Sequence, residues 1–243
     1  MANKYIYKSE TRGHANHGWL DTYHSFSFAS YFDPERIQFG ALRVLNDDTI
    51  AAGTGFGRHP HENMEIVSIP LSGVLEHKDS MGNVQIIKEG DIQVMSAGTG
   101  IFHSEFNGSK DKEGKFLQIW VLPDKINVTP RYDQITLNPA DRINQLQQIV
   151  SPNPDDEGVW IYQNAWFFMG RFDKGKQIDY RLKSKDNGLF CFVLEGKFNI
   201  DGDLLDRRDG VEIRDTDSVS IKSESNDSEI LLMDVPLNFI IKD

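Results

Sequence analysis

The sequence predicts an all-β protein made of two antiparallel β-barrels of the jelly-roll type, and three observations support this prediction. Short segments rich in β-branched and aromatic residues alternate with turn residues, and sustained 3.6-residue periodicity is scarce. Their spacing is typical of an antiparallel sandwich or barrel. A weak internal repeat indicates two similar halves, and 243 residues are long enough to hold both.

Turn residues set the limits of the predicted strands. In chain order, the predicted strands cover residues 39–45, 65–71, 84–87, 116–122 and 146–150. The first is expected to end at Asn46-Asp47-Asp48, the second at Ser72-Gly73 and the fourth at Pro123. Short helices are expected only around residues 33–36 and at Asn138-Pro139, where an asparagine cap precedes a proline at the first helical position.

The internal repeat compares two glycine-containing turns. Leu71-Ser72-Gly73 begins a stretch that reaches Gly90-Asp91, and Leu194-Glu195-Gly196 begins a similar one that reaches Thr216-Asp217. The second stretch is three residues longer, which fits one longer hairpin loop. We place the boundary near residue 134, which gives an N-terminal barrel over residues 1–133 and a C-terminal barrel over residues 134–243.

Composition excludes several classes of protein. With 37 acidic against 26 basic residues the formal net charge is −11, which disfavours direct binding of nucleic acid. Cys191 is the only cysteine, so no intrachain disulfide forms and a reducing compartment is favoured. The sequence contains neither a secretory signal pattern nor an apolar run approaching the ~20 residues of a membrane span. We therefore expect a cytoplasmic protein without a membrane segment.

The histidines point to a metal site in the first half. All seven lie within the first 103 residues. In a strand, residues two apart project from one face, so His59-Pro60-His61 and His103-Ser104-Glu105 each offer a pair of ligands. If the two strands face each other, three imidazoles and one carboxylate surround a point. This set suits divalent iron, manganese, nickel or copper better than calcium, and zinc also fits by ligand type. Pro60 requires an edge or bulged strand.

Two competing motifs are incomplete. His61-Glu62-Asn63-Met64-Glu65 is similar to the helical zinc-protease motif, but the second histidine is missing and strand-like residues follow. The glycine-rich run Gly53-Thr54-Gly55-Phe56-Gly57 has the wrong spacing for a dinucleotide fingerprint and opens no helix. Neither a zinc protease nor a nucleotide-binding enzyme is therefore expected.

Two longer patterns resemble the cupin motifs. The first comprises Gly53, His59, His61, Glu65 and Gly73, and the second comprises Gly90, Ser96, Gly98, His103 and Asn107. Two departures stand out: the gap from Glu65 to Gly73 is one residue longer, and Ser96 replaces the usual proline while His103 arrives two residues late. These departures, with the segments 23–28, 39–44, 77–83 and 96–105, resemble the pirin family. The resemblance is dense over residues 17–123 and thin beyond Asn138.

The resemblance implies a bicupin with one metal, usually iron, in the N-terminal barrel, held by residues His59, His61, His103 and Glu105. It implies a quercetin 2,3-dioxygenase that consumes a flavonol such as quercetin together with dioxygen, with Glu105 as the catalytic carboxylate that accepts the flavonol proton. It also implies an alternative, a non-catalytic iron-binding redox sensor that regulates a protein partner. A metal-free storage or sugar-binding cupin conflicts with the complete ligand set.

Three further residues have two readings each. Glu65 either orients a ligating imidazole or pairs with a neighbouring Arg or Lys. Gln118 either points into a pocket or is a buried, hydrogen-bonded core residue. Phe56 either lines the pocket mouth or packs in the core.

Two expectations concern the remaining histidines and the second barrel. His14, His17, His24 and His77 are expected to be loop or packing residues. The repeat aligns the four ligands with Leu182, Ser184, Glu229 and Leu231. The C-terminal barrel is therefore expected to bind no metal in this arrangement and to cover or support the first.

Overall fold

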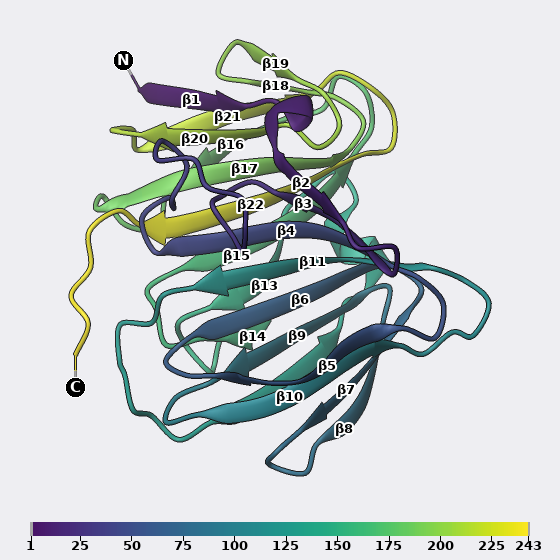
Figure 1. The fold of residues 1–243 in the computed structure, drawn as a ribbon. Coiled ribbons are helices and arrows are strands. Elements are labelled where there is room, and N and C mark those ends of the chain that lie inside the picture. The colour runs from purple at the N-terminus through teal and green to yellow at the C-terminus, as the bar shows by residue number, and fades with distance from the viewer. Residues whose placement is uncertain (1, 243) are drawn as a thin grey trace.

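The computed structural model describes residues 2–242 and confirms an all-β fold with two short 3₁₀ helices (Figure 1). Each half contains a seven-stranded and a four-stranded sheet. In the first barrel, the larger sheet has the order β12 (Arg131–Thr136), β9 (Asp91–Ser96), β6 (Glu65–Ser72), β11 (Gly114–Val121), β4 (Leu42–Ile50), β3 (Leu20–His24) and β2 (Gly13–Asn16). The smaller sheet has the order β5 (Gly55–His61), β10 (Ile101–Asn107), β7 (Val74–Asp79) and β8 (Val84–Lys88).

The second barrel repeats this plan. Its larger sheet has the order β1 (Asn3–Tyr7), β20 (Gly210–Arg214), β17 (Asn187–Glu195), β22 (Ser228–Pro236), β15 (Trp166–Phe172), β13 (Gln147–Ser151) and β14 (Val159–Trp160). Its smaller sheet has the order β16 (Gln177–Arg181), β21 (Ser218–Ser223), β18 (Phe198–Ile200) and β19 (Asp203–Leu205). Neighbouring strands are antiparallel except for β13 and β14. No helix within residues 2–242 is long and apolar enough to cross a membrane.

The first strand of the chain does not belong to the first barrel. β1 pairs with β20 in the register Asn3↔Arg214 to Tyr7↔Gly210, so the N-terminal segment lies in the large sheet of the second barrel (Figure 1). β12 holds the equivalent edge of the first barrel, beside β9. The boundary proposed near residue 134 falls inside β12.

The predicted strands at 65–71, 84–87, 116–122 and 146–150 correspond to β6, β8, β11 and β13. The predicted end of the first strand at Asn46-Asp47-Asp48 is wrong, because β4 begins at Leu42 and continues through these residues to Ile50. These three polar side chains remain within a strand because each finds a partner on its own face of the sheet: His24, an arginine pair and Thr22 respectively.

The helix predictions are mixed. At Asn138-Pro139 a short 3₁₀ helix, η2 (Pro139–Arg142), does form, and the Asn138 side chain accepts a hydrogen bond from the Ala140 backbone N–H. Residues 33–36 form a turn instead of a helix, with the Arg36 N–H donating to the Asp33 carbonyl at 3.0 Å. The helix η1 (Ser9–Thr11) was not predicted.

The repeat is real, but its alignment needs one correction. Gly73, between β6 and β7, and Gly196, between β17 and β18, hold equivalent turns with φ of +79° and +76°. Asp91 opens β9, and by pairing the counterpart of β9 is β20, which begins at Gly210. Equating Asp91 with Asp217 was therefore wrong by one strand. The counterparts of β5 and β10 are β16 and β21, so the positions inferred at Leu182, Ser184, Glu229 and Leu231 were also misplaced.

The interiors of the barrels differ in chemistry. The large sheets of the two barrels share one apolar cluster, which includes Val67 and Ile119 from the first and Phe167 and Leu231 from the second. The interior of the second barrel holds one continuous apolar cluster. The first barrel instead has two small apolar clusters, one around Phe116 and one around Met95 and Ile101. Buried polar side chains of the same strands make up the rest of its interior. This polar interior is where the predicted ligands lie.

Candidate metal centre

Strands β5 and β10 bring the two predicted ligand pairs together. His103 pairs directly with His59, whereas Glu105 pairs with Phe56, so β5 contains one extra residue at a bulge. Along β10, His103 and Glu105 are buried while Phe102 and Phe106 are exposed. β5 is an edge strand of its sheet. The edge position and the bulge both meet the requirement that Pro60 imposed.

Three imidazoles meet at this point. The ring centroids of His59 and His103 are 4.4 Å apart, and His61 lies 4.9 Å from each of the other two. One nitrogen from each of the three lies within 4.8 Å of the others. Glu105 lies in an overlapping group in which the third member is His77, and His103 belongs to both groups. His103 is thus central to the whole cluster.

The donor atoms fit a metal ion. His103 is 1% exposed, and neither of its ring nitrogens has a hydrogen-bond partner among the described residues. A buried imidazole without a partner is costly, and a bound cation would satisfy one nitrogen. His59 Nδ1 lies 2.7 Å from the Gly57 carbonyl oxygen, which leaves Nε2 as the donor to a metal.

Burial keeps these ligands in the form that metals bind. Desolvation, followed by the charge of His59, lowers the pKa of His61 to about 4. Desolvation, followed by the charges of His59 and His61, lowers the pKa of His103 below that of His61. Both imidazoles are therefore neutral near pH 7, as ligation requires. Burial raises the pKa of Glu105 to about 7, and a nearby cation would favour its ionised form.

Glu105 is held by two neutral groups. Gln118 Nε2 donates to Glu105 Oε2 at 2.8 Å. The Ser68 hydroxyl lies 2.8 Å from Gln118 Oε1 and 3.2 Å from Glu105 Oε1. Sequence reasoning missed Ser68. Ser68 lies opposite Gln118, and this pairing depends on the register between β6 and β11.

His77 also belongs to the cluster, although it was expected to be a loop or packing residue. It is fully buried in β7, and its ring lies 5.3 Å from that of His103. His77 Nδ1 and both amide atoms of buried Gln93 have no partner among the described residues. The signal that was overlooked is the alternation of Leu75, His77 and Asp79 along β7.

Glu65 has partners other than an imidazole. The Ser96 hydroxyl donates to Glu65 Oε2 at 2.7 Å, and the backbone N–H of Tyr162 bonds the same carboxylate. Burial raises the pKa of Glu65 to about 7. These contacts tie the first barrel to the segment between β14 and β15.

A cavity of about 610 Å³ opens beside the imidazoles, within the size range of small-molecule sites. Its lining combines aromatic side chains, polar side chains and candidate ligands. The lining includes Trp19, Thr22, His24, Phe28, Asn46, Asp48, Phe56, His59, His61, Glu105, Gln118 and Trp120. Phe56 and Gln118 thus both lie at the pocket.

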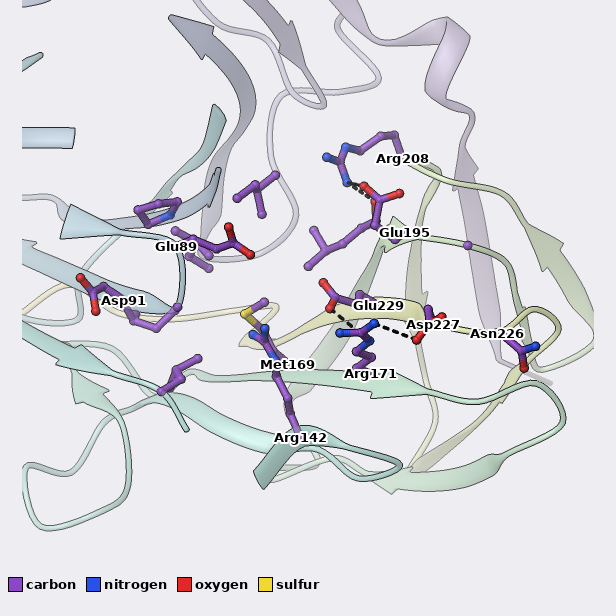
Figure 2. A pocket seen from close by; sticks show the side chains of 18 residues that line it. Glu89, Asp91, Arg142, Met169, Arg171, Glu195, Arg208, Asn226, Asp227 and Glu229 are labelled. Carbon is purple, nitrogen blue, oxygen red and sulfur yellow. Dashed lines mark hydrogen bonds and ion pairs between the residues drawn. The ribbon is translucent and has the colours of Figure 1, made fainter. Parts of the chain in front are cut away.

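A second cavity of about 530 Å³ lies between the barrels and contains no histidine (Figure 2). Two of its arginines form ion pairs: Arg171 lies 2.7 Å from Asp227, and Arg208 lies 3.8 Å from Glu195. This cavity therefore lacks the ligand set and the aromatic walls of the first.

Comparison with known proteins identifies relatives over nearly the whole chain. Residues 6–121 match the family model described as Pirin, and residues 148–235 match the quercetinase C-terminal cupin domain. A quercetin 2,3-dioxygenase of Escherichia coli (strain K12) is 42% identical over 232 residues, which cover 96% of this chain and 98% of that protein. A pirin-like protein of Caulobacter vibrioides is 37% identical over 91% of this chain and 95% of that protein.

A solved structure is also similar over nearly the whole chain. The crystal structure of the bacterial pirin YhhW of Escherichia coli in complex with nickel(II) has a TM-score of 0.91 and 41% identity to this chain. The match covers 96% of this chain and 99% of the crystallised one. Vicilin of hazelnut, at 12% identity and a TM-score of 0.67, shares the fold alone.

Proposed function

Because this chain belongs to the pirin family, we propose that it is a metal-dependent dioxygenase of the quercetin 2,3-dioxygenase type. Its substrates are then a flavonol such as quercetin and dioxygen. One observation carries the proposal. Buried His103, whose ring nitrogens have no partner within residues 2–242, lies with His59 and His61 beside a small-molecule cavity with aromatic walls.

The metal would be held by His59, His61, His103 and Glu105. Three imidazoles and one carboxylate suit a divalent transition metal, and we propose iron, with nickel, manganese, copper or zinc as the other ions that such ligands bind. When bound, the ion supplies positive charge that acidifies a ligating hydroxyl, and it supports reaction with dioxygen.

The aromatic side chains bind the planar rings of the substrate. Trp19, Phe28, Phe56 and Trp120 all line the cavity. Trp120 meets Phe28 and His61 edge to face, with ring centroids 5.4 and 5.0 Å apart. These contacts hold the walls in place and exclude water from the substrate rings.

Glu105 accepts the proton of the flavonol 3-hydroxyl. Its carboxylate is buried next to His103, and Gln118 and Ser68 fix its orientation. A general base must lie within hydrogen-bond reach of the proton that it takes, and Glu105 lines the cavity in which the flavonol would bind. The proton transfer leaves an electron-rich enolate as the species that reacts with dioxygen.

The test is aerobic consumption of quercetin, followed by its absorbance, with protein of measured metal content. We expect turnover by the metal-loaded protein, and loss of at least ~100-fold in His59→Ala and in metal-stripped protein. His14→Ala is the control, because His14 is an exposed residue that stacks on Tyr23 outside the cluster. Absence of turnover at full metal occupancy would reject the proposal.

A further inference from the structure

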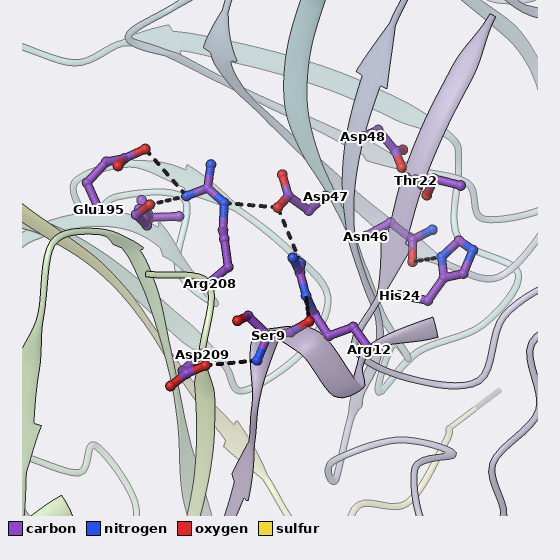
Figure 3. A network of polar contacts seen from close by, with 11 residues as sticks. Ser9, Arg12, Thr22, His24, Asn46, Asp47, Asp48, Glu195, Arg208 and Asp209 are labelled. Atoms are coloured by element: carbon purple, nitrogen blue, oxygen red, sulfur yellow. Dashed lines mark hydrogen bonds and ion pairs between the residues drawn. The ribbon is translucent and has the colours of Figure 1, made fainter. Parts of the chain in front are cut away.

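A polar wall faces the same cavity from strands β3 and β4. Thr22 and His24 on β3 pair in register with Asp48 and Asn46 on β4, and Figure 3 shows these four side chains. All four line the cavity, and so does Glu105. Thr22, Asn46 and Asp48 lie inside their strands, and His24 is the last residue of β3. None of the four belongs to the two groups of candidate metal ligands found among the described residues.

Asp48 is a buried acid without a counter-ion. It is 3% exposed, its one hydrogen bond comes from the Thr22 hydroxyl, and it forms no ion pair within residues 2–242. One carboxyl oxygen therefore remains without a protein partner. Burial raises the pKa of Asp48 to about 7, so both protonation states are accessible near neutrality. A buried carboxyl is costly unless something bonds to it.

Asn46 supplies the complementary group. His24 Nδ1 lies 2.8 Å from Asn46 Oδ1, so the imidazole fixes the carboxamide. With Oδ1 engaged, the Asn46 NH₂ group is left as a donor, and it bonds to none of the described residues. The wall thus presents an acceptor from Asp48 beside a donor from Asn46.

The chemistry of the wall selects the ligand. An anionic group would be repelled by the Asp48 carboxylate, and a cationic group would be disfavoured by the metal ion in the same cavity. A neutral hydroxyl suits both states of Asp48, because it donates to the carboxylate and accepts from the carboxylic acid. A hydroxyl can also accept from the Asn46 NH₂ group.

We propose that Asp48 and Asn46, held by Thr22 and His24, form a hydroxyl-binding subsite that selects polyhydroxylated planar aromatic substrates. This inference rests on the proposed function, because it assigns the part of the substrate remote from the metal. The aromatic walls bind the rings, and the subsite discriminates among substrates by their additional hydroxyl groups.

A purely structural role is a poorer explanation. The backbones of Thr22 and Asp48 already pair across β3 and β4, so their side-chain bond is not needed to join the strands. The strand is also anchored from its other face, where Asp47 lies 3.2 Å from Arg12 and 2.9 Å from Arg208 (Figure 3). A second Thr in place of Asp48 would make the same cross-strand contact without burying a carboxyl.

The test is ligand binding to the metal-loaded protein without oxygen, followed by quenching of Trp19 and Trp120 fluorescence. The probes are quercetin and 3-hydroxyflavone, which keeps the metal-facing hydroxyl and carbonyl but lacks the other hydroxyls. In Asp48→Val we expect the Kd for quercetin to rise roughly 10- to 100-fold and that for 3-hydroxyflavone to change less than about twofold. Asp48→Asn should restore part of the preference.

Two outcomes overturn the subsite. The first is an equal loss of affinity for both flavonols in Asp48→Val. The second needs no variant: wild-type protein that binds quercetin no more tightly than 3-hydroxyflavone has no hydroxyl selection. Failure of the proposed function is distinct, because then the metal-loaded wild type turns over neither flavonol in air.

Discussion

The carboxylate of Glu105 is oriented by neutral partners alone. Gln118 donates to one oxygen and Ser68 approaches the other, so no cation of the protein competes with a metal for its charge. A neutral amide in this position keeps the carboxylate available to a divalent ion while restricting its rotation. Groups that orient a ligand in this way contribute measurably to metal affinity.

Gln118→Met should therefore weaken metal binding while the fold is retained. Methionine fills a similar volume but cannot donate to Glu105, and we expect affinity to fall roughly 10- to 100-fold. Competition with a chelator, followed by metal analysis of the separated protein, measures the change. Gln38→Met, at an exposed glutamine, is the control. An unchanged affinity in Gln118→Met would show that Glu105 is not a ligand or does not need this bond.

Residues of the cluster were predictable where the spacing alone carried the signal. His59, His61, His103 and Glu105 are separated by two within each strand, and period-two alternation is enough to put each pair on one face. Ser68, His77 and Asp48 each share a strand with other polar side chains. Their inward direction depends on the register with neighbouring strands, which the local sequence does not define.

Strand β4 carries different chemistry on its two faces. Asn46 and Asp48 face the cavity of the first barrel, while Asp47 faces the second barrel and lies between Arg12 and Arg208 (Figure 3). The sequence suggested a turn at these three residues, because Asn and Asp are common in turns. The partners that keep them in a strand come from distant segments, and Arg208 lies 161 residues from Asp47.

Removal of the Asp47 carboxylate should destabilise the protein, because it leaves two largely buried guanidinium groups without their shared partner. The Arg12 and Arg208 side chains are only 6% and 8% exposed. We expect Asp47→Ala to lower the free energy of unfolding by about 3 kcal/mol. Urea denaturation measures this free energy of unfolding. Asp111→Ala, at an exposed carboxylate, should change it by less than about 0.5 kcal/mol.

At the scale of the molecule, the interiors of the two barrels differ, and both groups of candidate metal ligands lie in the first. The interior of the second is filled by apolar side chains such as Phe198 and Leu232, which leaves no polar cluster for a metal among its described residues. Its large sheet buries the apolar face of the first barrel. We propose that the second barrel supports the first. The second barrel also includes β1, because residues 3–7 pair with β20.

The two-barrel plan was predictable because the turn signals at Gly73 and Gly196 recur in the sequence. The position of β1 was not predictable, since its partner β20 lies some 200 residues away and nothing local favours one barrel over the other. The alignment of the repeat failed for a related reason. β19 is a three-residue strand, and its short hairpin moved the second half out of phase with the first.

We expect Glu65, which lies at the contact between the two barrels, to make the stability of the protein depend on pH. It is 1% exposed, and burial raises its pKa from 4.5 to about 7 against the opposing effects of Ser96, Tyr162 and Arg131. A carboxyl with a raised folded-state pKa contributes most to stability below its unfolded pKa. That contribution is lost as pH rises through the folded pKa. The window therefore runs from about pH 4.5 to about pH 7.

Glu65→Gln should remove this dependence. The amide keeps an oxygen to accept from Ser96 or Tyr162 and carries no charge to desolvate. The unfolding free energy of the variant minus that of the wild type should increase by on the order of 2–3 kcal/mol when the pH is raised from 5 to 8. Urea denaturation at both values measures this, with exposed Glu10→Gln as control. A difference that stays constant across the window would mean that Glu65 ionises normally in the folded protein, and that the interface between the barrels admits water at this point.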